Sequence, residues 1–432
     1  MTPPSSETVF TWGAPPIKFG PGAADELGHD LEQLGVHRVL LLTDPGVADT
    51  GTPHRIAEHV RGAGLTVEIF DKVHIEPTDA SLREAIAFAA GSSWDGFVAV
   101  GGGSAIDTAK AVNLMTSHPG GDLMDYVNAP VGGGKAPPGP VKPLVAVPTT
   151  AGTGAECTPV CVLDILGMKV KSGISHPRLR PSLAVIDPLV TLTLPPEVTA
   201  ASGMDVLCHA LESWTARPYD AYPRRRPEQR VAYCGANPIS DIWIEHTLRI
   251  LARSLRTAVR SGDDLAARSD MLAAATYAGM GFGNAGVHIP HACAYPIAGR
   301  VRSYRPAGYP AAGTEGGAPE PLIPHGQSVS LTAPAAFRFT FDADPQRHLQ
   351  AARLLDPHDP GGDPRERLPA AVVALMRDIG IPNGIAAVGF GEDDIADLVE
   401  GTLAQQRLLS IAPCEPTAEQ LAAIFRNSLR NW

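Results

Sequence analysis

The most informative stretch of the chain reads Phe97-Val98-Ala99-Val100-Gly101-Gly102-Gly103-Ser104. The short apolar run is typical of a buried strand, and the residues after it continue with a helical pattern. Glycine lets a backbone approach a phosphate closely, and a helix N-terminus offers free N–H groups and a positive dipole end. Gly102, Gly103 and Ser104 are therefore candidates for binding a dinucleotide, with Ser104 also a candidate N-cap. A tight strand–helix turn without a ligand is the alternative, because the spacing is not G-x-G-x-x-G.

A second loop of similar character follows the apolar run Leu144–Val147. It reads Pro148-Thr149-Thr150-Ala151-Gly152-Thr153-Gly154-Ala155-Glu156. Hydroxyl groups interleaved with glycines can hydrogen-bond phosphate and ribose oxygens, which strengthens the prediction of a dinucleotide site. The candidates in this loop are Thr149, Thr150 and Thr153.

Asp44 ends an earlier apolar run, His37–Thr43. An acidic side chain in this place can accept a hydrogen bond from the adenosine ribose. It would also repel a 2′-phosphate, so Asp44 predicts NAD(H) in preference to NADP(H). A helix cap or a turn is the alternative role for Asp44.

Strand-like and helix-like patterns alternate through the first half of the chain, which predicts an α/β fold with a parallel sheet covered on both faces. After Leu194-Pro195-Pro196 only helical patterns remain. We therefore predict an α/β dinucleotide-binding domain over residues 1–193 and an all-helical metal-binding domain over residues 194–432. The expected strands are 37–44, 65–70, 95–100, 143–148 and 183–188, and the expected helices are 79–90, 105–113, 200–217, 239–261, 265–282, 370–378, 392–402 and 417–429.

Candidate metal ligands lie in the second half. Asp205 and His209 are spaced i, i+4 and share one face of a predicted helix, with Glu212 as a possible partner beyond them. His288 and His291 compete for a third ligand position, and the spacing alone does not choose between them. His325 follows in a Pro-His-Gly sequence. One carboxylate and three imidazoles suit Fe²⁺, Zn²⁺ or another borderline divalent ion. The alternative for Asp205 and His209 is that they are ordinary polar residues of a helix and bind no metal.

Composition narrows the class of protein. The formal net charge is −11 and the chain has no basic stripe, which argues against a nucleic-acid partner. No apolar run reaches the ~18–20 residues that a membrane span needs. The six cysteines form no C-x-x-C pair, and we see neither a signal peptide nor an Arg-rich transit peptide. These features lead us to expect a cytoplasmic enzyme, and we also expect a homodimer.

Taken together, these motifs resemble the iron-containing (group III) alcohol dehydrogenase family over nearly the whole chain. The resemblance implies a Rossmann-like N-terminal domain and a helical C-terminal domain, the architecture shared with dehydroquinate synthases. It implies NAD(H) and a divalent metal, most readily Fe²⁺. It assigns Lys171 to the nicotinamide end of the cofactor site. The metal ligands that it implies are Asp205, His209, His291 and His325.

The match is closest to the hydroxyacid-oxoacid transhydrogenase branch. Shared segments include Glu76-Pro77-Thr78-Asp79, Val206–Ser213, Asn237–Trp243 and Gly281–His288. This resemblance implies oxidation of 4-hydroxybutyrate or a similar hydroxy acid and reduction of 2-oxoglutarate, with the nicotinamide as an internal hydride carrier. Tyr295 stands where many members of the wider family have a histidine.

Proton transfer from the substrate hydroxyl has two candidates, His288 and Tyr295. We rank His288 slightly ahead, because an imidazole titrates near neutral pH and a phenol near ~10. Packing at a helix break is the alternative role for both.

Three other functions compete with the transhydrogenase. They are an ordinary NAD(P)H-dependent alcohol dehydrogenase or aldehyde reductase, a metal- and NAD-dependent cyclase resembling dehydroquinate synthase, and a non-catalytic NAD-binding scaffold. The cyclase would be expected to carry a cluster of basic residues near the metal for a phosphorylated substrate, and the sequence shows none.

Overall fold

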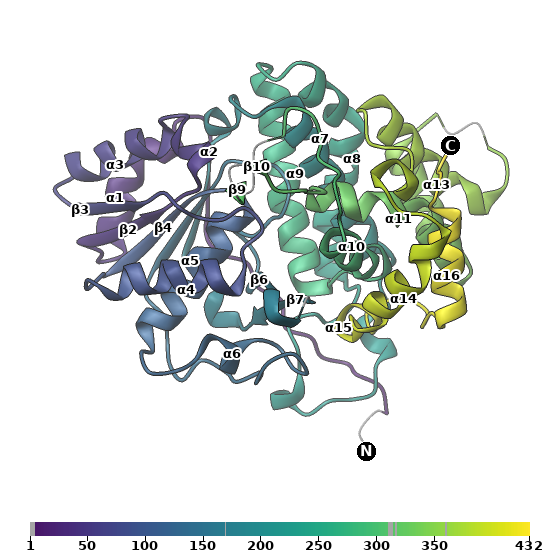
Figure 1. Cartoon of the computed structure of the whole chain (residues 1–432), viewed down its shortest axis with the longest axis horizontal. Helices are drawn as coiled ribbons and strands as arrows, with labels where there is room; N and C mark the ends of the chain where they lie inside the picture. Colours follow the sequence, from purple (N-terminus) through teal and green to yellow (C-terminus); the bar gives the residue numbers. More distant parts are fainter. Residues whose placement is uncertain (1–4, 169, 310–313, 316–317, 359–360) are drawn as a thin grey trace. The chain divides into compact units, whose positions relative to one another are not determined.

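The computed structural model describes residues 5–168, 170–309, 314–315, 318–358 and 361–432 (Figure 1). The chain divides into two compact units, which we call the α/β unit and the helical unit. The α/β unit runs from Ala14 to Leu194 and includes a short hairpin, β9 (Thr314–Glu315) with β10 (Ala318–Pro319). The helical unit holds the segment ending at Gly13 and the remainder from Pro195 onward. The unit boundary lies one residue from the predicted one, but the N-terminal segment and the hairpin lie in the opposite units.

The α/β unit is built on a six-stranded parallel sheet in the order β1-β8-β5-β4-β2-β3. Each of the five predicted strands is present, and within this sheet the prediction missed only the three-residue edge strand β1. Gly101 pairs with Pro148 across β4 and β5, so the glycine turn and the threonine loop leave the sheet at the same level. The strands are β1 (Ile17–Phe19), β2 (Arg38–Leu42), β3 (Thr66–Phe70), β4 (Gly96–Gly101), β5 (Leu144–Pro148) and β8 (Leu183–Ile186).

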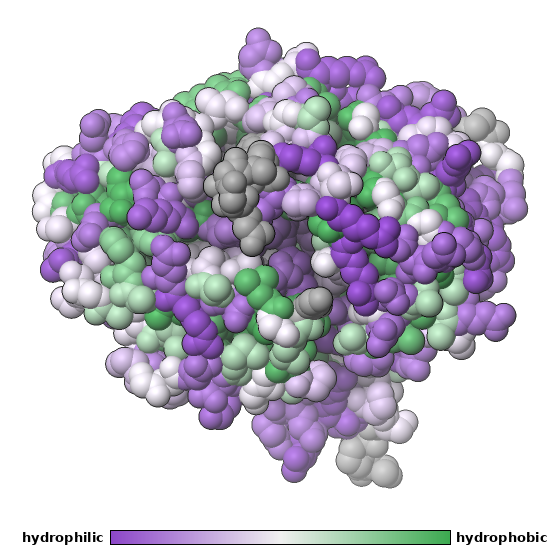
Figure 2. All heavy atoms as spheres, viewed as in Figure 1, coloured by the Kyte–Doolittle hydropathy of each residue, from purple (hydrophilic) through white to green (hydrophobic). Residues whose placement is uncertain are grey.

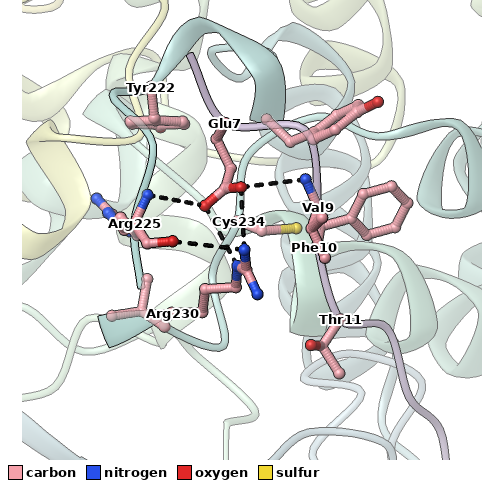
Figure 3. Close-up of a pocket in the computed structure, with 10 residues that line it drawn as sticks. Glu7, Val9, Phe10, Thr11, Tyr222, Arg225, Arg230 and Cys234 are labelled. Carbon is pink, nitrogen blue, oxygen red and sulfur yellow. Dashed lines mark hydrogen bonds and ion pairs between the residues drawn. The ribbon is translucent and has the colours of Figure 1, made fainter. Parts of the chain in front are cut away.

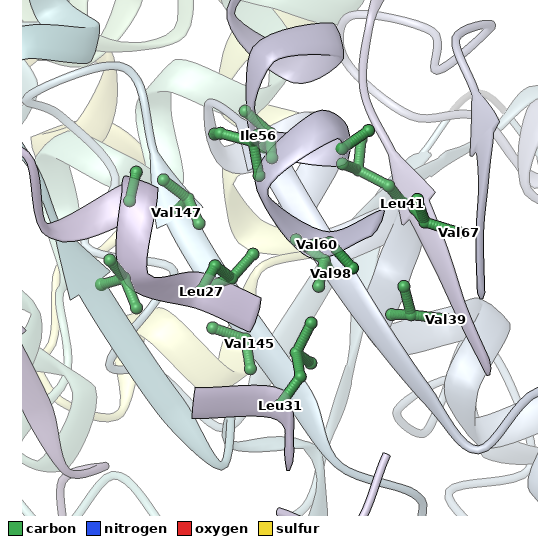
Figure 4. Packing of buried hydrophobic residues seen from close by; sticks show 14 of the residues in the cluster. Leu27, Leu31, Val39, Leu41, Ile56, Val60, Val67, Val98, Val145 and Val147 are labelled. Carbon is green, nitrogen blue, oxygen red and sulfur yellow. The ribbon is translucent and has the colours of Figure 1, made fainter. Parts of the chain in front are cut away.

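Helices cover both faces of this sheet, which explains why its central strands are apolar at every position. Val39 and Leu41 of β2 pack on one face, together with residues of α1 and α3 (Figure 4). Leu40 and Leu42 point to the other face, where α4 and α5 pack. The helices of this unit are α1 (Leu27–Gln33), α2 (Pro45–Ala48), α3 (Thr52–Gly62), α4 (Asp79–Ala90), α5 (Gly103–Ser117) and α6 (Leu123–Tyr126).

An antiparallel hairpin, β6 (Val160–Ile165) with β7 (Val170–Ser175), was not predicted. A buried ion pair on α5 holds it in place. Lys110 Nζ lies 3.1 Å from Asp107 Oδ1 and donates to the Val160 carbonyl at 2.6 Å. Asp107 Oδ2 in turn accepts from the Val162 N–H. Because β7 contains polar residues and a glycine, it lacks the regular alternation of apolar and polar residues that predicts a strand.

The helical unit contains α7 (Pro196–Thr215), α8 (Pro238–Arg260), α9 (Leu265–Ala285), α10 (Ile289–Gly299), α11 (His325–Thr340), α12 (Pro345–Leu355), α13 (Pro364–Asp378), α14 (Ile395–Leu403), α15 (Gln406–Leu409) and α16 (Ala418–Asn427). The sequence predicted α7–α9, α13, α14 and α16 but missed α10, α11, α12 and the four-residue α15. Pro296 and Pro334 lie inside α10 and α11, and a proline within a helix removes the pattern on which prediction relies.

The N-terminal segment joins the helical unit through Glu7. Its carboxylate accepts hydrogen bonds from Arg230 and from the Arg225 backbone, within a small pocket that also contains Cys234 (Figure 3). Arg230 and backbone N–H groups lower the pKa of Glu7 to about 2. Asn284 then exchanges two hydrogen bonds with Gly13. Sequence patterns carry no record of such long-range pairings, so the prediction assigned this segment to the α/β domain.

Among the described residues, no helix combines the length and the apolar composition needed to cross a membrane. Hydrophilic side chains predominate on the face drawn in Figure 2, and hydrophobic ones form small separate groups.

Replacing Lys110 by Met should lower the free energy of unfolding by about 3–5 kcal/mol, because the buried Asp107 carboxylate would lose its partner. Urea unfolding curves followed by circular dichroism measure this. Arg83→Ala is the matched control, since Arg83 pairs with Asp122 at 3.0 Å on the surface and exposed pairs contribute about 1 kcal/mol or less. Equal stability of the two variants would contradict a structural role for the buried pair.

Candidate metal and dinucleotide sites

Three helices of the helical unit bring the predicted metal ligands together. Asp205 and His209 share one face of α7, His291 lies in the first turn of α10, and His325 begins α11. One ligand atom from each of Asp205, His209 and His291 lies within 4.8 Å of the other two. His325 Nε2 is 3.9 Å from Asp205 Oδ1, so the fourth candidate lies beside the same cluster.

Gly326 explains how α11 comes so close to α7. A Cβ atom at this position would lie 2.1 Å from the Ala201 carbonyl oxygen and 2.6 Å from Asp205 Cβ. Only glycine leaves room for the contact, which brings His325 next to Asp205. The Pro-His-Gly sequence therefore has a steric reason for its glycine.

Three polar atoms at the centre of this cluster are buried and lack hydrogen-bond partners among the described residues. They are Asp205 Oδ1, His209 Nδ1 and His291 Nε2. His291 Nε2 is 3.6 Å from Asp205 Oδ1, too far for a good hydrogen bond, and His209 Nδ1 is 3.8 Å from Asp205 Oδ2. A buried polar atom without a partner costs about 1–3 kcal/mol. One divalent ion among them would satisfy all three, so the residues present fit a metal.

Neighbouring side chains hold the imidazoles in these orientations. The His209 ring stacks on Phe282 of α9, with ring centroids 3.8 Å apart and an interplanar angle of 4°. His291 Nδ1 lies 2.6 Å from Glu212 Oε1. A carboxylate hydrogen-bonded to the far nitrogen of an imidazole is the usual support of a histidine ligand.

The buried titratable groups of the cluster shift one another's pKa values. Burial favours the neutral form of Asp205, but the surrounding imidazoles outweigh it and hold the pKa of Asp205 well below its ordinary value. Burial lowers the pKa of His209 to about 3. Burial also opposes the charged form of His291, but Glu212 and Asp205 raise its pKa to about 9. His291 therefore holds a proton more tightly than His209 does.

His288 lies outside the cluster, and the structure corrects its predicted catalytic role. The side chain is fully buried and caps α10, with Nδ1 accepting from the Ile289 N–H at 2.8 Å. Nε2 therefore carries the proton and donates it to Thr215 Oγ1 at 3.0 Å. Burial lowers the pKa of His288 to about 4. With both nitrogens engaged, His288 acts as a helix cap and not as a proton carrier.

Tyr295, the other candidate for proton transfer, lies one turn after His291 on α10. Its ring centroid is 6.2 Å from that of His325, with an angle of 35° between the planes. The side chain is partly exposed. Of the two candidates, only Tyr295 lies beside the metal cluster.

In the α/β unit, the glycine turn and the threonine loop lie against each other. A Cβ atom at Gly102 would lie 3.1 Å from Thr150 Oγ1, and one at Gly103 would lie 2.7 Å from Thr153 Cγ2. Gly102 is the N-cap of α5 and offers no capping side chain. The structure thus corrects the predicted capping role of Ser104, whose hydroxyl accepts instead from the Glu76 N–H at 3.0 Å. The first turn of α5 has no side-chain cap from its N-cap residue, so its first backbone N–H groups can donate to an anion.

Asp44 has the capping role that the sequence offered as its alternative, and its second carboxylate oxygen lies beside the glycine turn. Its Oδ1 accepts from the Val47 N–H and caps α2. Its Oδ2 lies 3.4 Å from where a Cβ of Gly101 would be, next to the glycine turn. Burial raises the pKa of Asp44. Nearby, Thr149 Oγ1 is buried and has no hydrogen-bond partner among the described residues, so it can accept or donate to a ligand.

Lys171 is bound by two carboxylates that the prediction had not assigned. Its Nζ is 2.6 Å from Glu76 Oε2 and 2.9 Å from Asp164 Oδ2. Burial opposes the charge, but the two carboxylates raise the pKa of Lys171 above its ordinary value. Among the described non-glycine residues, Glu76 alone has a positive φ, 58°. Strained residues of this kind concentrate at functional sites. In the sequence, the only indication of Glu76 was the segment Glu76-Pro77-Thr78-Asp79 shared with the transhydrogenases.

Comparison with known proteins assigns the family. A family model described as "Iron-containing alcohol dehydrogenase" matches residues 14–188, and "Fe-containing alcohol dehydrogenase family, C-terminal" matches 228–302 and 320–429. The chain is 45% identical to "Hydroxyacid-oxoacid transhydrogenase, mitochondrial" of Bos taurus, covering 99% of this chain and 92% of that one. The Homo sapiens protein of the same name is 44% identical, with the same coverage.

Solved structures agree with the predicted fold. A 1,3-propanediol oxidoreductase has a TM-score of 0.83 and 32% identity, covering 98% of this chain and 100% of that one. An alcohol dehydrogenase from Oenococcus oeni also has a TM-score of 0.83, with 26% identity, covering 97% of this chain and 100% of that one. The α/β domain followed by a helical domain is thus confirmed.

The relatives correct one expectation and confirm another. The expected cytoplasmic location is contradicted, because the transhydrogenases named above are mitochondrial proteins. Unpaired, scattered cysteines argue only against an oxidising compartment and could not have identified the cytoplasm. The resemblance inferred from the glycine turn, the threonine loop and the Asp–His spacing is confirmed. This chain belongs to the iron-containing alcohol dehydrogenase family and is an oxidoreductase of that type.

Proposed function

We propose that this protein is a hydroxyacid-oxoacid transhydrogenase. It would oxidise a hydroxy acid such as 4-hydroxybutyrate to the corresponding aldehyde acid and reduce 2-oxoglutarate to 2-hydroxyglutarate. One hydride and one proton leave the first substrate and are added to the second, so NAD(H) is regenerated within the cycle. The observation that carries the proposal is the cluster of unpartnered buried atoms on Asp205, His209 and His291 in a chain 45% identical to such enzymes.

We assign Asp205, His209, His291 and His325 as ligands of one divalent ion, and Fe²⁺ as that ion, in keeping with the family. A bound divalent ion would supply Lewis acidity, which lowers the pKa of an alcohol and polarises a carbonyl. Tyr295 would pass the substrate proton toward solvent, because it lies beside the cluster and is partly exposed.

We assign the dinucleotide to the α/β unit, where NAD(H) would supply the hydride acceptor and donor. The backbone of Gly102 and Gly103, the first turn of α5 and the hydroxyls of Thr149, Thr150 and Thr153 would hold the phosphates. Ser104 would support this turn through Glu76. Asp44 would accept from the adenosine ribose, and Lys171 would lie toward the nicotinamide.

An ordinary NAD(P)H-dependent alcohol dehydrogenase is the second candidate. Its support is the 32% identity to a 1,3-propanediol oxidoreductase over nearly the whole of both chains. The two functions differ in whether the reduced cofactor leaves the protein between half-reactions. The expected homodimer stays a prediction, which light scattering coupled to size-exclusion chromatography tests.

Transfer of isotope between two substrates distinguishes the two candidates. The purified enzyme is given 4-hydroxybutyrate deuterated at C4, unlabelled 2-oxoglutarate and no added nicotinamide. A transhydrogenase should form 2-hydroxyglutarate carrying deuterium at C2, measured by mass spectrometry. Excess unlabelled NADH should not dilute the label. Turnover only with added NAD(H), with the label lost to the added pool, would establish the ordinary dehydrogenase.

Replacing His209 or His325 by Ala should remove most of the bound metal and nearly all activity, since each would supply one of four protein ligands. Metal content by inductively coupled plasma mass spectrometry and activity measure the effect. His246→Ala is the control, because His246 is exposed on α8 and is not a member of the cluster. Full metal content in the His209 and His325 variants would remove the ligand assignment.

Replacing Asp44 by Asn should weaken the preference for NAD(H) over NADP(H) by roughly ten- to a hundredfold, the scale of one charged hydrogen bond. Asn can still cap α2 but no longer repels a 2′-phosphate. The ratio of kcat/KM for the two cofactors measures the change, with an external carbonyl substrate. An unchanged ratio would leave Asp44 with its capping role alone.

A further inference from the structure

Glu212 is a fully buried carboxylate on α7, on the same face as Asp205 and His209 and one turn beyond them. Its described hydrogen-bond partners all come from the start of α10. Oε2 accepts from the backbone N–H of His288 at 2.6 Å and from that of His291 at 3.3 Å. Oε1 lies 2.6 Å from His291 Nδ1. One carboxylate thus serves both a helix N-terminus and an imidazole.

The two oxygens of Glu212 face different kinds of donor. The backbone N–H groups at Oε2 are fixed donors and can never accept. The imidazole at Oε1 is adaptable, because a neutral ring carries its proton on either nitrogen. A carboxylate only accepts, so it requires the proton of His291 to be on Nδ1. The lone pair of Nε2 is then directed toward Asp205, where Nε2 has no hydrogen-bond partner.

We propose that Glu212 is a positioning residue that fixes His291 in the tautomer able to bind the metal through Nε2. The inference rests on the proposed metal centre and adds a residue to it. The separate contact of Oε2 with the backbone gives Glu212 a structural role at the start of α10. A useful test must change the hydrogen bond from Glu212 to the His291 ring and keep the hydrogen bonds to the backbone of α10.

Glu212→Gln makes this separation, since glutamine has nearly the same shape but one acceptor and one donor. Its oxygen must face the two backbone N–H groups, because they cannot reverse their polarity. The amide NH₂ must then face His291 Nδ1, which becomes an acceptor and moves the ring proton to Nε2. The cap of α10 is retained, whereas the nitrogen that faces the metal is blocked.

The experiment titrates the metal-free wild-type protein and Glu212→Gln with Zn²⁺ and with Co²⁺. We expect the dissociation constant for both ions to be about ten- to a hundredfold larger in the variant. This is the usual effect of losing a carboxylate that orients a histidine ligand. The visible absorption of the Co²⁺ protein reports the number of ligands, and we expect it to change. Thr215→Val is the matched control, because it removes a neighbouring buried hydrogen bond, that to His288, and should leave both measurements unchanged.

A double-mutant cycle with His291→Ala tests whether Glu212 acts through His291. Glu212→Gln should cost no further metal affinity in the His291→Ala background. This comparison still decides the question if the single variant is less stable, because a general loss of structure would weaken binding in both backgrounds.

The outcomes are distinct. Wild-type affinity and Co²⁺ spectrum in Glu212→Gln would overturn the inference and leave the proposed metal centre intact. An additive loss in the double variant would also overturn it, by assigning Glu212 a structural role alone. A wild-type protein that binds neither ion would overturn the proposed centre and this inference together.

Discussion

The arrangement of the helical unit depends on a cluster of buried polar atoms that the protein itself leaves unpaired. Asp205 Oδ1, His209 Nδ1 and His291 Nε2 lie within one small region, and none has a hydrogen-bond partner among the described residues. Such atoms are costly in a packed interior. One divalent cation would satisfy all three, because they come from a carboxylate and two imidazoles whose ligand atoms can lie within 4.8 Å of one another. The close approach of α11 at Gly326, the stacking of His209 on Phe282 and the support of His291 by Glu212 all maintain this geometry.

In the α/β unit, the proposed dinucleotide site requires a backbone that a phosphate can approach closely. Gly102 and Gly103 face Thr150 and Thr153, where a Cβ atom would be crowded at Gly102 and would collide with Thr153 at Gly103. The register of β4 against β5 brings the two loops to the same edge of the sheet, so a pattern that is weak in either loop becomes specific when both are present. Under the proposed assignment, the donors are backbone N–H groups of the strand–helix turn, and the usual glycine fingerprint is then not required.

Sequence reasoning succeeded where local pattern and burial agree. Strands β4 and β5 are apolar throughout, and β2 is apolar after Arg38, because both faces of the sheet are covered, and that leaves a signal in the sequence. It failed where structure depends on long-range contacts or on proline-containing helices. The β6–β7 hairpin is held by Asp107 and Lys110 from a distant helix, and α10 and α11 contain prolines. Residue spacing could not choose between His288 and His291, because both lie at the start of α10 and only their hydrogen bonds distinguish them.

Those hydrogen bonds at the start of α10 both stabilise the helix and position His291. Gly286, with a φ of 98°, ends α9 and turns the chain, and His288 caps the helix that follows. His291 then falls in the first turn, where the backbone N–H groups are still unpaired and where a carboxylate is favoured by the helix dipole. Glu212 meets both needs from α7, the helix that also carries Asp205 and His209. Because one side chain caps α10 and orients His291, the helix cannot begin elsewhere without also displacing the imidazole from the cluster. The local folding of α10 and the geometry of the metal site are therefore a single structural requirement.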